Sequence, residues 1–127
     1  MFKIVGHTIS LTRGDSCTIS LKVSKKESDD DYIFHPDDIV EMNVYNKKAL
    51  DQEPLMTKEV VVLEDTNIVD ISLDSSDTKI GEMSNKPIEY WYEIQLNREQ
   101  TIIGYDESGP KVFMLYPEGD VIRWIQM

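Results

Sequence analysis

The sequence has few of the residues on which metalloproteins and disulfide-bonded secreted proteins depend. It holds one cysteine, two histidines and six glycines in 127 residues. Because Cys17 is alone, the fold needs no internal disulfide and no oxidising compartment. His7, His35 and Cys17 show none of the ligand spacings of zinc sites. We therefore predict no metal and no cofactor.

Long apolar runs are also absent. No stretch approaches the roughly 20 apolar residues that a membrane-spanning helix needs. Residues 1–10 lack the apolar core and the small-residue cleavage site of a signal peptide. We expect a protein without a membrane partner, made in a cytoplasm and kept there until it joins something else.

Basic residues are few beside acidic ones. The chain has 13 Lys and Arg against 24 Asp and Glu, which gives a net charge of −11. Binding to a phosphate backbone requires the opposite sign, so nucleic acid is not an expected partner. The acidity either keeps the protein soluble and apart from its copies or helps it dock on a basic partner.

Catalytic motifs are missing as well. The sequence has no Gly-X-Ser-X-Gly elbow, no Cys–His signature and no phosphate-binding glycine loop. We predict no enzyme and no catalytic residue. The acidic stretch Asp29–Asp38 offers oxygen ligands that could suit calcium, but it lacks the EF-hand spacing. A solvated loop is the alternative.

What the sequence does contain is apolar–polar alternation with a period of two, the pattern of β-strands. It predicts about eight or nine short strands in one domain, residues 1–127, an all-β antiparallel sandwich whose strands follow each other at roughly ten-residue spacing. Asp74–Met83 alone has the capping residues and the closing glycine of a short helix. The expected strands are Thr8–Thr12, Ser16–Val23, Ile39–Asn46, Leu55–Leu63, Val69–Leu73, Ile88–Asn97, Ile102–Tyr105, Val112–Tyr116 and Val121–Ile125.

Between the first two expected strands stands the tripeptide Arg13-Gly14-Asp15. Glycine gives the backbone the freedom for a tight bend, and Asp15 can accept a bond from a nearby amide. Integrins recognise the same tripeptide, but in extracellular ligands. We interpret Arg13, Gly14 and Asp15 as a structural turn.

The strand around Trp91 carries the candidate binding residues. Alternation places Tyr90, Tyr92, Ile94 and Leu96 on one face, and Trp91 on the other face between Glu89 and Glu93. Tryptophan is enriched at binding hot spots. We predict partner binding at Trp91, Glu89 and Glu93; burial of Trp91 under a loop or a second sheet is the alternative.

Two further aromatic features bear on function. Trp124 stands among Val121, Ile122 and Ile125 and is expected in a last strand or against a partner. Tyr105 and Tyr116, together with Trp91, could instead stack on sugar rings. A carbohydrate-binding module is therefore the alternative function.

Three segments carry a resemblance to a known family. They are Ile9–Ile19, with its Gly-Asp turn between two strands; Pro36–Val44, a turn with acidic residues before a strand; and Tyr92–Leu96, a Tyr-X-Ile-X-Leu strand. In this outline the chain resembles small β-sandwich domains of tailed phages and prophages of Gram-positive bacteria, such as the N-terminal domain of siphophage upper baseplate proteins.

The resemblance implies a non-enzymatic virion structural protein, in a tail, a baseplate or a decorated capsid surface. Its expected partners are other virion proteins and its own copies in a symmetric assembly, and its expected place is the virion, assembled in the cytoplasm of the host bacterium. Upper baseplate proteins continue into helical and further domains, so a separate virion component is implied. The family contributes no catalytic residue.

Overall fold

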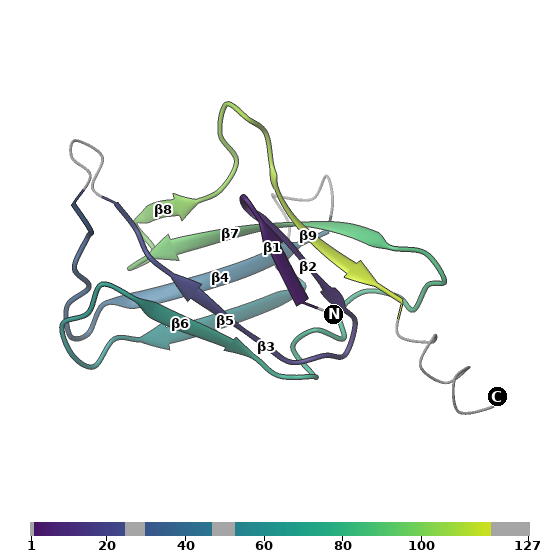
Figure 1. The fold of residues 1–127 in the computed structure, drawn as a ribbon, viewed down its shortest axis with the longest axis horizontal. Coiled ribbons are helices and arrows are strands. Elements are labelled where there is room, and N and C mark those ends of the chain that lie inside the picture. Colours follow the sequence, from purple (N-terminus) through teal and green to yellow (C-terminus); the bar gives the residue numbers. More distant parts are fainter. Residues whose placement is uncertain (1, 25–29, 47–52, 118–127) are drawn as a thin grey trace.

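The computed structural model describes residues 2–24, 30–46 and 53–117, which form nine strands and no helix (Figure 1). The protein is all-β, as predicted. The strands are β1 (Phe2–Val5), β2 (Thr8–Thr12), β3 (Cys17–Leu21), β4 (Ile39–Tyr45), β5 (Met56–Val61), β6 (Val69–Leu73), β7 (Ile88–Leu96), β8 (Gln100–Ile103) and β9 (Lys111–Tyr116).

The strands form two sheets. Seven belong to one sheet, in the order β1-β2-β9-β7-β4-β5, with β8 paired to β7 beside this path. The prediction of antiparallel pairing throughout is wrong for this sheet, which is mixed: β2 and β9 run parallel while its other pairs are antiparallel. The remaining two strands, β3 and β6, pair antiparallel in a small sheet, which lies in front of the larger one in Figure 1.

One hydrophobic core receives side chains from both sheets. The small sheet contributes Ile19 and Ile71, which face each other across the β3–β6 pair. The large sheet contributes Val40, Ile94 and Phe113, none of them more than 1% exposed. Alternation explains this division, because successive side chains of a strand point to opposite faces of the sheet.

Seven of the predicted strands are present within a few residues of their expected bounds. An eighth, expected at Ile102–Tyr105, instead occupies Gln100–Ile103, because a tight turn over residues 97–99, centred on Asn97 and Arg98, starts β8 early. Asn97 and Arg98 both have positive φ, and the Glu99 amide donates to the Leu96 carbonyl. The strand predicted at Val121–Ile125 lies outside the described residues, and β1 was not predicted.

The predicted helix at Asp74–Met83 is wrong. Residues 74–79 form successive turns, with the Asp77 amide donating to the Asp74 carbonyl and the Lys79 amide to that of Ser76. The Asp74 carboxylate also accepts from the Asp77 amide, and the Asp77 carboxylate accepts from the Asp74 amide. These local bonds satisfy the amides without an α-helical ladder, and so short a segment could not offset the cost of helix nucleation.

The Arg13-Gly14-Asp15 segment lies in the turn between β2 and β3. Gly14 has a φ of 89°, and the Asp15 amide donates to the Thr12 carbonyl. The turn docks on residues 74–81: the Gly14 amide donates to Thr78 Oγ1, and the Arg13 guanidinium donates to the Ile80 carbonyl. The Arg13 side chain thus holds two turns together.

Candidate partner-binding site

The candidate site lies on the outer face of the seven-stranded sheet, defined here as the face turned away from the core. Along β7 the inward side chains of Tyr90, Tyr92, Ile94 and Leu96 are buried, as predicted. The outward side chains of Glu89, Trp91 and Glu93 are half-buried. Tyr45 of β4 and Val112 of β9 stand directly beside Trp91 on the neighbouring strands.

Trp91 meets a second aromatic side chain on this face. The ring of Tyr105 lies 6.1 Å from that of Trp91, edge to face, with 63° between the ring planes. Tyr105 is 66% exposed. A hollow of about 60 Å³ opens beside them, with Glu93 and Pro110 in its lining. We call Trp91, Glu93, Tyr105 and Pro110 the Trp91–Tyr105 patch.

Trp91 carries an unusual polar atom. Its Nε1 is buried and has no hydrogen-bond acceptor within the part of the chain that the structure describes. A buried indole N–H normally finds a partner, because leaving a buried donor unpaired costs about 1–3 kcal/mol. The indole is therefore held in place by its apolar neighbours rather than by a polar contact.

Glu93 is positioned by a tyrosine. The hydroxyl of Tyr45 donates to Glu93 Oε1 at 2.7 Å. Burial, followed by this contact with the Glu93 carboxylate, raises the pKa of Tyr45 to about 12. The bond fixes one carboxylate oxygen beside Trp91, so Glu93 presents a defined negative charge at the edge of the hollow.

Lys111 anchors the turn that carries the rest of the patch. Its side chain is nearly buried, and Nζ donates to Asp106 Oδ1 at 2.8 Å and to Ser108 Oγ at 3.2 Å. Asp106 and Gly109 also exchange two backbone bonds. Lys111 and Ser108 hold the pKa of the Asp106 carboxyl well below its usual range. Tyr105 and Pro110 flank this turn, so the ion pair sets where they lie.

Carboxylates dominate the electrostatics of the outer face. Glu41 and Glu59 stand opposite each other on β4 and β5, a pairing of like charges that is unfavourable alone. Arg98 relieves it, with Nε 3.4 Å from Glu41 and one terminal nitrogen 3.0 Å from Glu59. With Glu89 and Glu93 nearby, this face carries more negative than positive charge among the described residues.

The structure brings some of the predicted site residues together. Trp91 and Glu93 belong to one patch, and Glu89 lies on the same side of β7. Tyr105, predicted only as a possible sugar contact, joins Trp91. Tyr116 does not lie near Trp91, because it is opposite Thr12 at the far end of β9. Trp124 lies outside the described residues.

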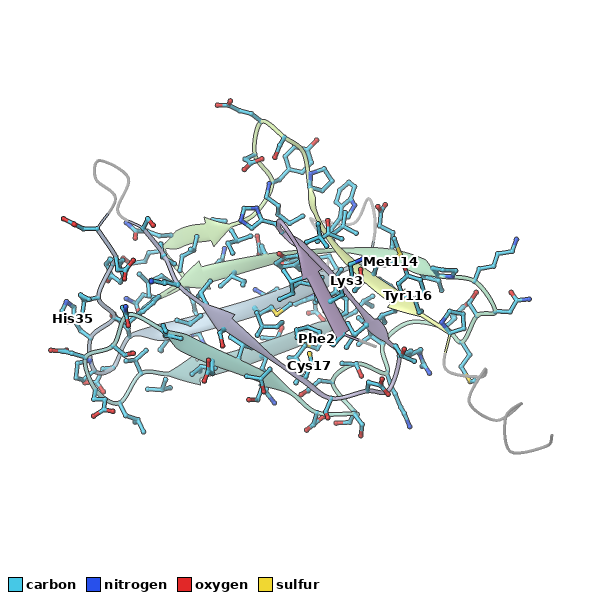
Figure 2. All side chains as sticks on the ribbon, in the orientation of Figure 1. Phe2, Lys3, Cys17, His35, Met114 and Tyr116 are labelled. Atoms are coloured by element: carbon cyan, nitrogen blue, oxygen red, sulfur yellow. The ribbon has the colours of Figure 1, made fainter. Side chains whose placement is uncertain are left out.

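The other candidate ligands are dispersed. Figure 2 shows His35 at one end of the long axis and Cys17 near the middle of the molecule. Asp31 accepts from Asn67, whereas Asp38 accepts from the His35 amide and from Asn97. In residues 2–24, 30–46 and 53–117 no three potential metal ligands gather. Asp29, at the start of the predicted acidic loop, lies outside these ranges.

Sequence reasoning missed the supports of the patch. The Tyr45–Glu93 bond joins residues 48 positions apart, and no local pattern signals it. The Lys111–Asp106 pair spans five residues across a hairpin turn. Its one sequence signal is a lysine at an inward strand position, where a buried charge requires a partner.

Comparison with protein-family models, with curated proteins and with solved structures finds no match to this chain. Within the described residues, no helix has the length and apolar character needed to cross a membrane.

Proposed function

We propose that this chain is a non-enzymatic structural protein of a phage or prophage virion, which binds other virion proteins and its own copies in a tail, a baseplate or a head surface. The observation that carries the binding role is the Trp91–Tyr105 patch, an exposed aromatic ring and a positioned carboxylate on a sheet face. The phage setting rests on the sequence resemblance described above. We further propose that the two sheets form an incomplete sandwich, because they share one core and β5 contacts β6.

The size and charge of the patch suggest what it binds. A hollow of about 60 Å³ is far below the roughly 300 Å³ or more of typical small-ligand sites. It suits one inserted side chain of a protein. Glu93 at its rim and the aromatic rings both attract a cation, so the complementary partner presents an arginine or a lysine.

Affinity purification from an induced lysogen tests this binding role, with the tagged chain and its Tyr105→Ala variant as baits. Tyr105 is exposed, so its truncation removes partner contacts with little effect on folding. We expect portal, capsid or tail proteins with the original chain and at least about tenfold less with the variant, the loss typical of a hot-spot residue.

The matched control for this purification is Leu63→Ala, which truncates another exposed apolar residue outside the patch. We expect Leu63→Ala to recover the same proteins as the original chain. Equal recovery by the Tyr105→Ala variant would show that the Trp91–Tyr105 patch does not bind these proteins. The absence of viral proteins from the purification would refute the virion role.

Carbohydrate binding is the second candidate. The exposed ring of Tyr105 next to the Glu93 carboxylate is a combination that can stack on a sugar and accept its hydroxyl protons. A glycan array read with the original chain and with Trp91→Ala tests it. A signal that the substitution abolishes would support this candidate, and an array without signal would eliminate it.

A further inference from the structure

The edge strand β1 exposes apolar side chains and ends the strand order of the large sheet. Among residues 2–24, 30–46 and 53–117 its one pairing partner is β2 (Figure 1). All four of its residues are exposed, including Phe2 at 41%, Ile4 at 45% and Val5 at 61%. Figure 2 shows Phe2 and Lys3 on this strand. Such an edge is a ready template for another strand unless charge or proline protects it.

The charge around β1 distinguishes it from the rest of the molecule. None of the 24 acidic residues stands among residues 1–14, which contain Lys3 and Arg13. With a net charge of −11, two copies of the chain repel each other over most approaches. At the β1–β2 hairpin, which contains no Asp or Glu, they can meet without opposing carboxylates.

The hairpin fixes which backbone groups of β1 are free. Val5 and Thr8 close a two-residue Gly6-His7 loop, so they form a hydrogen-bonded pair. Hydrogen-bonded and non-hydrogen-bonded pairs alternate along an antiparallel ladder. Val5 and Lys3 therefore direct their N–H and C=O groups toward β2, while Phe2 and Ile4 direct theirs toward the open edge.

We infer that two copies of the chain associate by antiparallel pairing of β1 with β1 of the second copy, centred on Ile4. This deepens the proposed function, because it rests on the self-assembly part of that proposal and names the edge and the register. In this register each Ile4 exchanges two backbone bonds with Ile4 of the other copy, and Phe2 lies opposite Gly6. Lys3 lies opposite Val5, so the two lysines do not face each other.

The pairing also covers apolar surface beside β1. Ile4 lines a hollow of about 180 Å³ between β1 and the small sheet, together with Ile19, Leu21 and Ile94. A two-fold axis through Ile4 keeps the inward faces of the two copies on the same side, so the second Ile4 lies at the mouth of this hollow. Residues 2–6 of each copy, five residues, form a small interface, which predicts weak, concentration-dependent association.

Disulfide cross-linking tests the register. In a Cys17→Ala background, single cysteines are placed at Lys3, Ile4 or Val5 and the protein is oxidised. Ile4→Cys should form a covalent dimer, because opposed residues in this pairing have Cα atoms about 5.5 Å apart, within disulfide range. Lys3→Cys and Val5→Cys should cross-link at least about tenfold less. In either variant the two cysteines are displaced from each other by two residues along the paired strands, which puts them outside disulfide range.

Val5 is the matched control, because it is more exposed than Ile4. Random collisions would link Val5→Cys at least as well as Ile4→Cys, and that result would overturn the inference. Preferential linking of Lys3→Cys would overturn the register.

Sedimentation over a range of concentrations tests the association without cysteine. Ile4→Pro removes an outward N–H and leaves the bonds to β2 in place, which an edge strand tolerates. We expect unfolding as in the original chain and a dimer weakened about tenfold or more by the two lost bonds. An original chain that stays monomeric, or a dimer that Ile4→Pro leaves unchanged, would refute the pairing.

The two proposals fail in distinguishable ways. Tyr105→Ala alters the outer-face patch and should leave Ile4→Cys cross-linking intact. Loss of cross-linking together with retained capture of virion proteins would refute only the β1 pairing. Cross-linking without capture of any virion protein would refute the proposed function and leave the pairing standing.

Discussion

At the scale of single residues, a few positions tolerate only one kind of side chain. Gly81 has a φ of 66°, and a Cβ added there would lie 1.9 Å from the hydroxyl oxygen of Tyr90. Tyr90 is a core residue of β7, so it cannot move aside freely. Thr78 is fully buried and joins the turn at Gly14 to the turn at residues 74–81. Stability at these positions depends on contact geometry rather than on hydrophobicity.

Gly81→Ala should lower the free energy of unfolding by about 2–4 kcal/mol, from left-handed strain and overpacking together. Denaturant unfolding measures it. The control is Gly6→Ala: Gly6 has a similar φ of 59° with nothing within 4 Å of the added Cβ, so only the strain of about 1–2 kcal/mol remains. Equal losses in the two variants would contradict the contact with Tyr90.

Tyr45 and Tyr92 should make the protein sensitive to alkali. Burial, aided at Tyr45 by Glu93, raises the pKa of both to about 12 from a usual value of 10. Between pH 10 and 12 the folded chain then binds more protons than the unfolded chain, so the free energy of unfolding falls as pH rises. The stabilisation is complete below pH 10.

Unfolding measured across this range in the original chain and in Tyr45→Phe tests the effect. The decline should be less steep in the variant, which has one titrating group fewer. An unchanged slope would mean that Tyr45 does not hold its proton against Glu93 in the folded state.

At the scale of elements, alternation was a reliable guide to where strands lie and a poor one to how they pair. It predicted Thr8–Thr12 and Val69–Leu73 with the bounds that the structure has. It carries no information on direction, so the parallel β2–β9 pair was not foreseen. The segment that begins at Asp74 has the capping residues of a helix. In the structure, however, the carboxylates of Asp74 and Asp77 accept hydrogen bonds from each other's backbone amides within one turn. Local sequence signals of a cap are therefore ambiguous between a helix and a turn.

The docking of the Arg13-Gly14-Asp15 turn makes a prediction at this scale. Thr78→Val keeps the shape of the side chain and deprives the Gly14 amide and the Asp15 carbonyl of their partner. The expected loss is about 1–3 kcal/mol in the free energy of unfolding. Thr18→Val, at an exposed hydroxyl bonded to Ser72, should cost less than about 0.5 kcal/mol. A neutral Thr78→Val would show that the two turns are held by other contacts.

At the scale of the whole molecule, the sequence located half of the candidate site. Alternation placed Trp91 and Glu93 on the outer face because that property is local to one strand. The approach of Tyr105 depends on a hairpin whose position follows from a β-bulge in the β7–β8 pairing and from the Lys111–Asp106 ion pair. Those contacts join separate segments, so no window of sequence contains them.

The charge distribution also acts at this scale. Acidic residues spread over the chain from Asp15 onward, while the N-terminal hairpin has none. We propose two separate binding surfaces: the outer-face patch for a basic partner and the β1 edge for a second copy. Assembly through both would give a symmetric unit attached to a larger structure.

The measurement that tests the central claim most directly is quantitative mass spectrometry of virus particles purified on a density gradient from an induced lysogen. The account predicts that the chain co-sediments with intact particles in fixed proportion to a tail or capsid protein, and that Tyr105→Ala lowers this proportion while Leu63→Ala does not. A chain that is expressed but absent from the particle fractions would contradict the role in virion assembly.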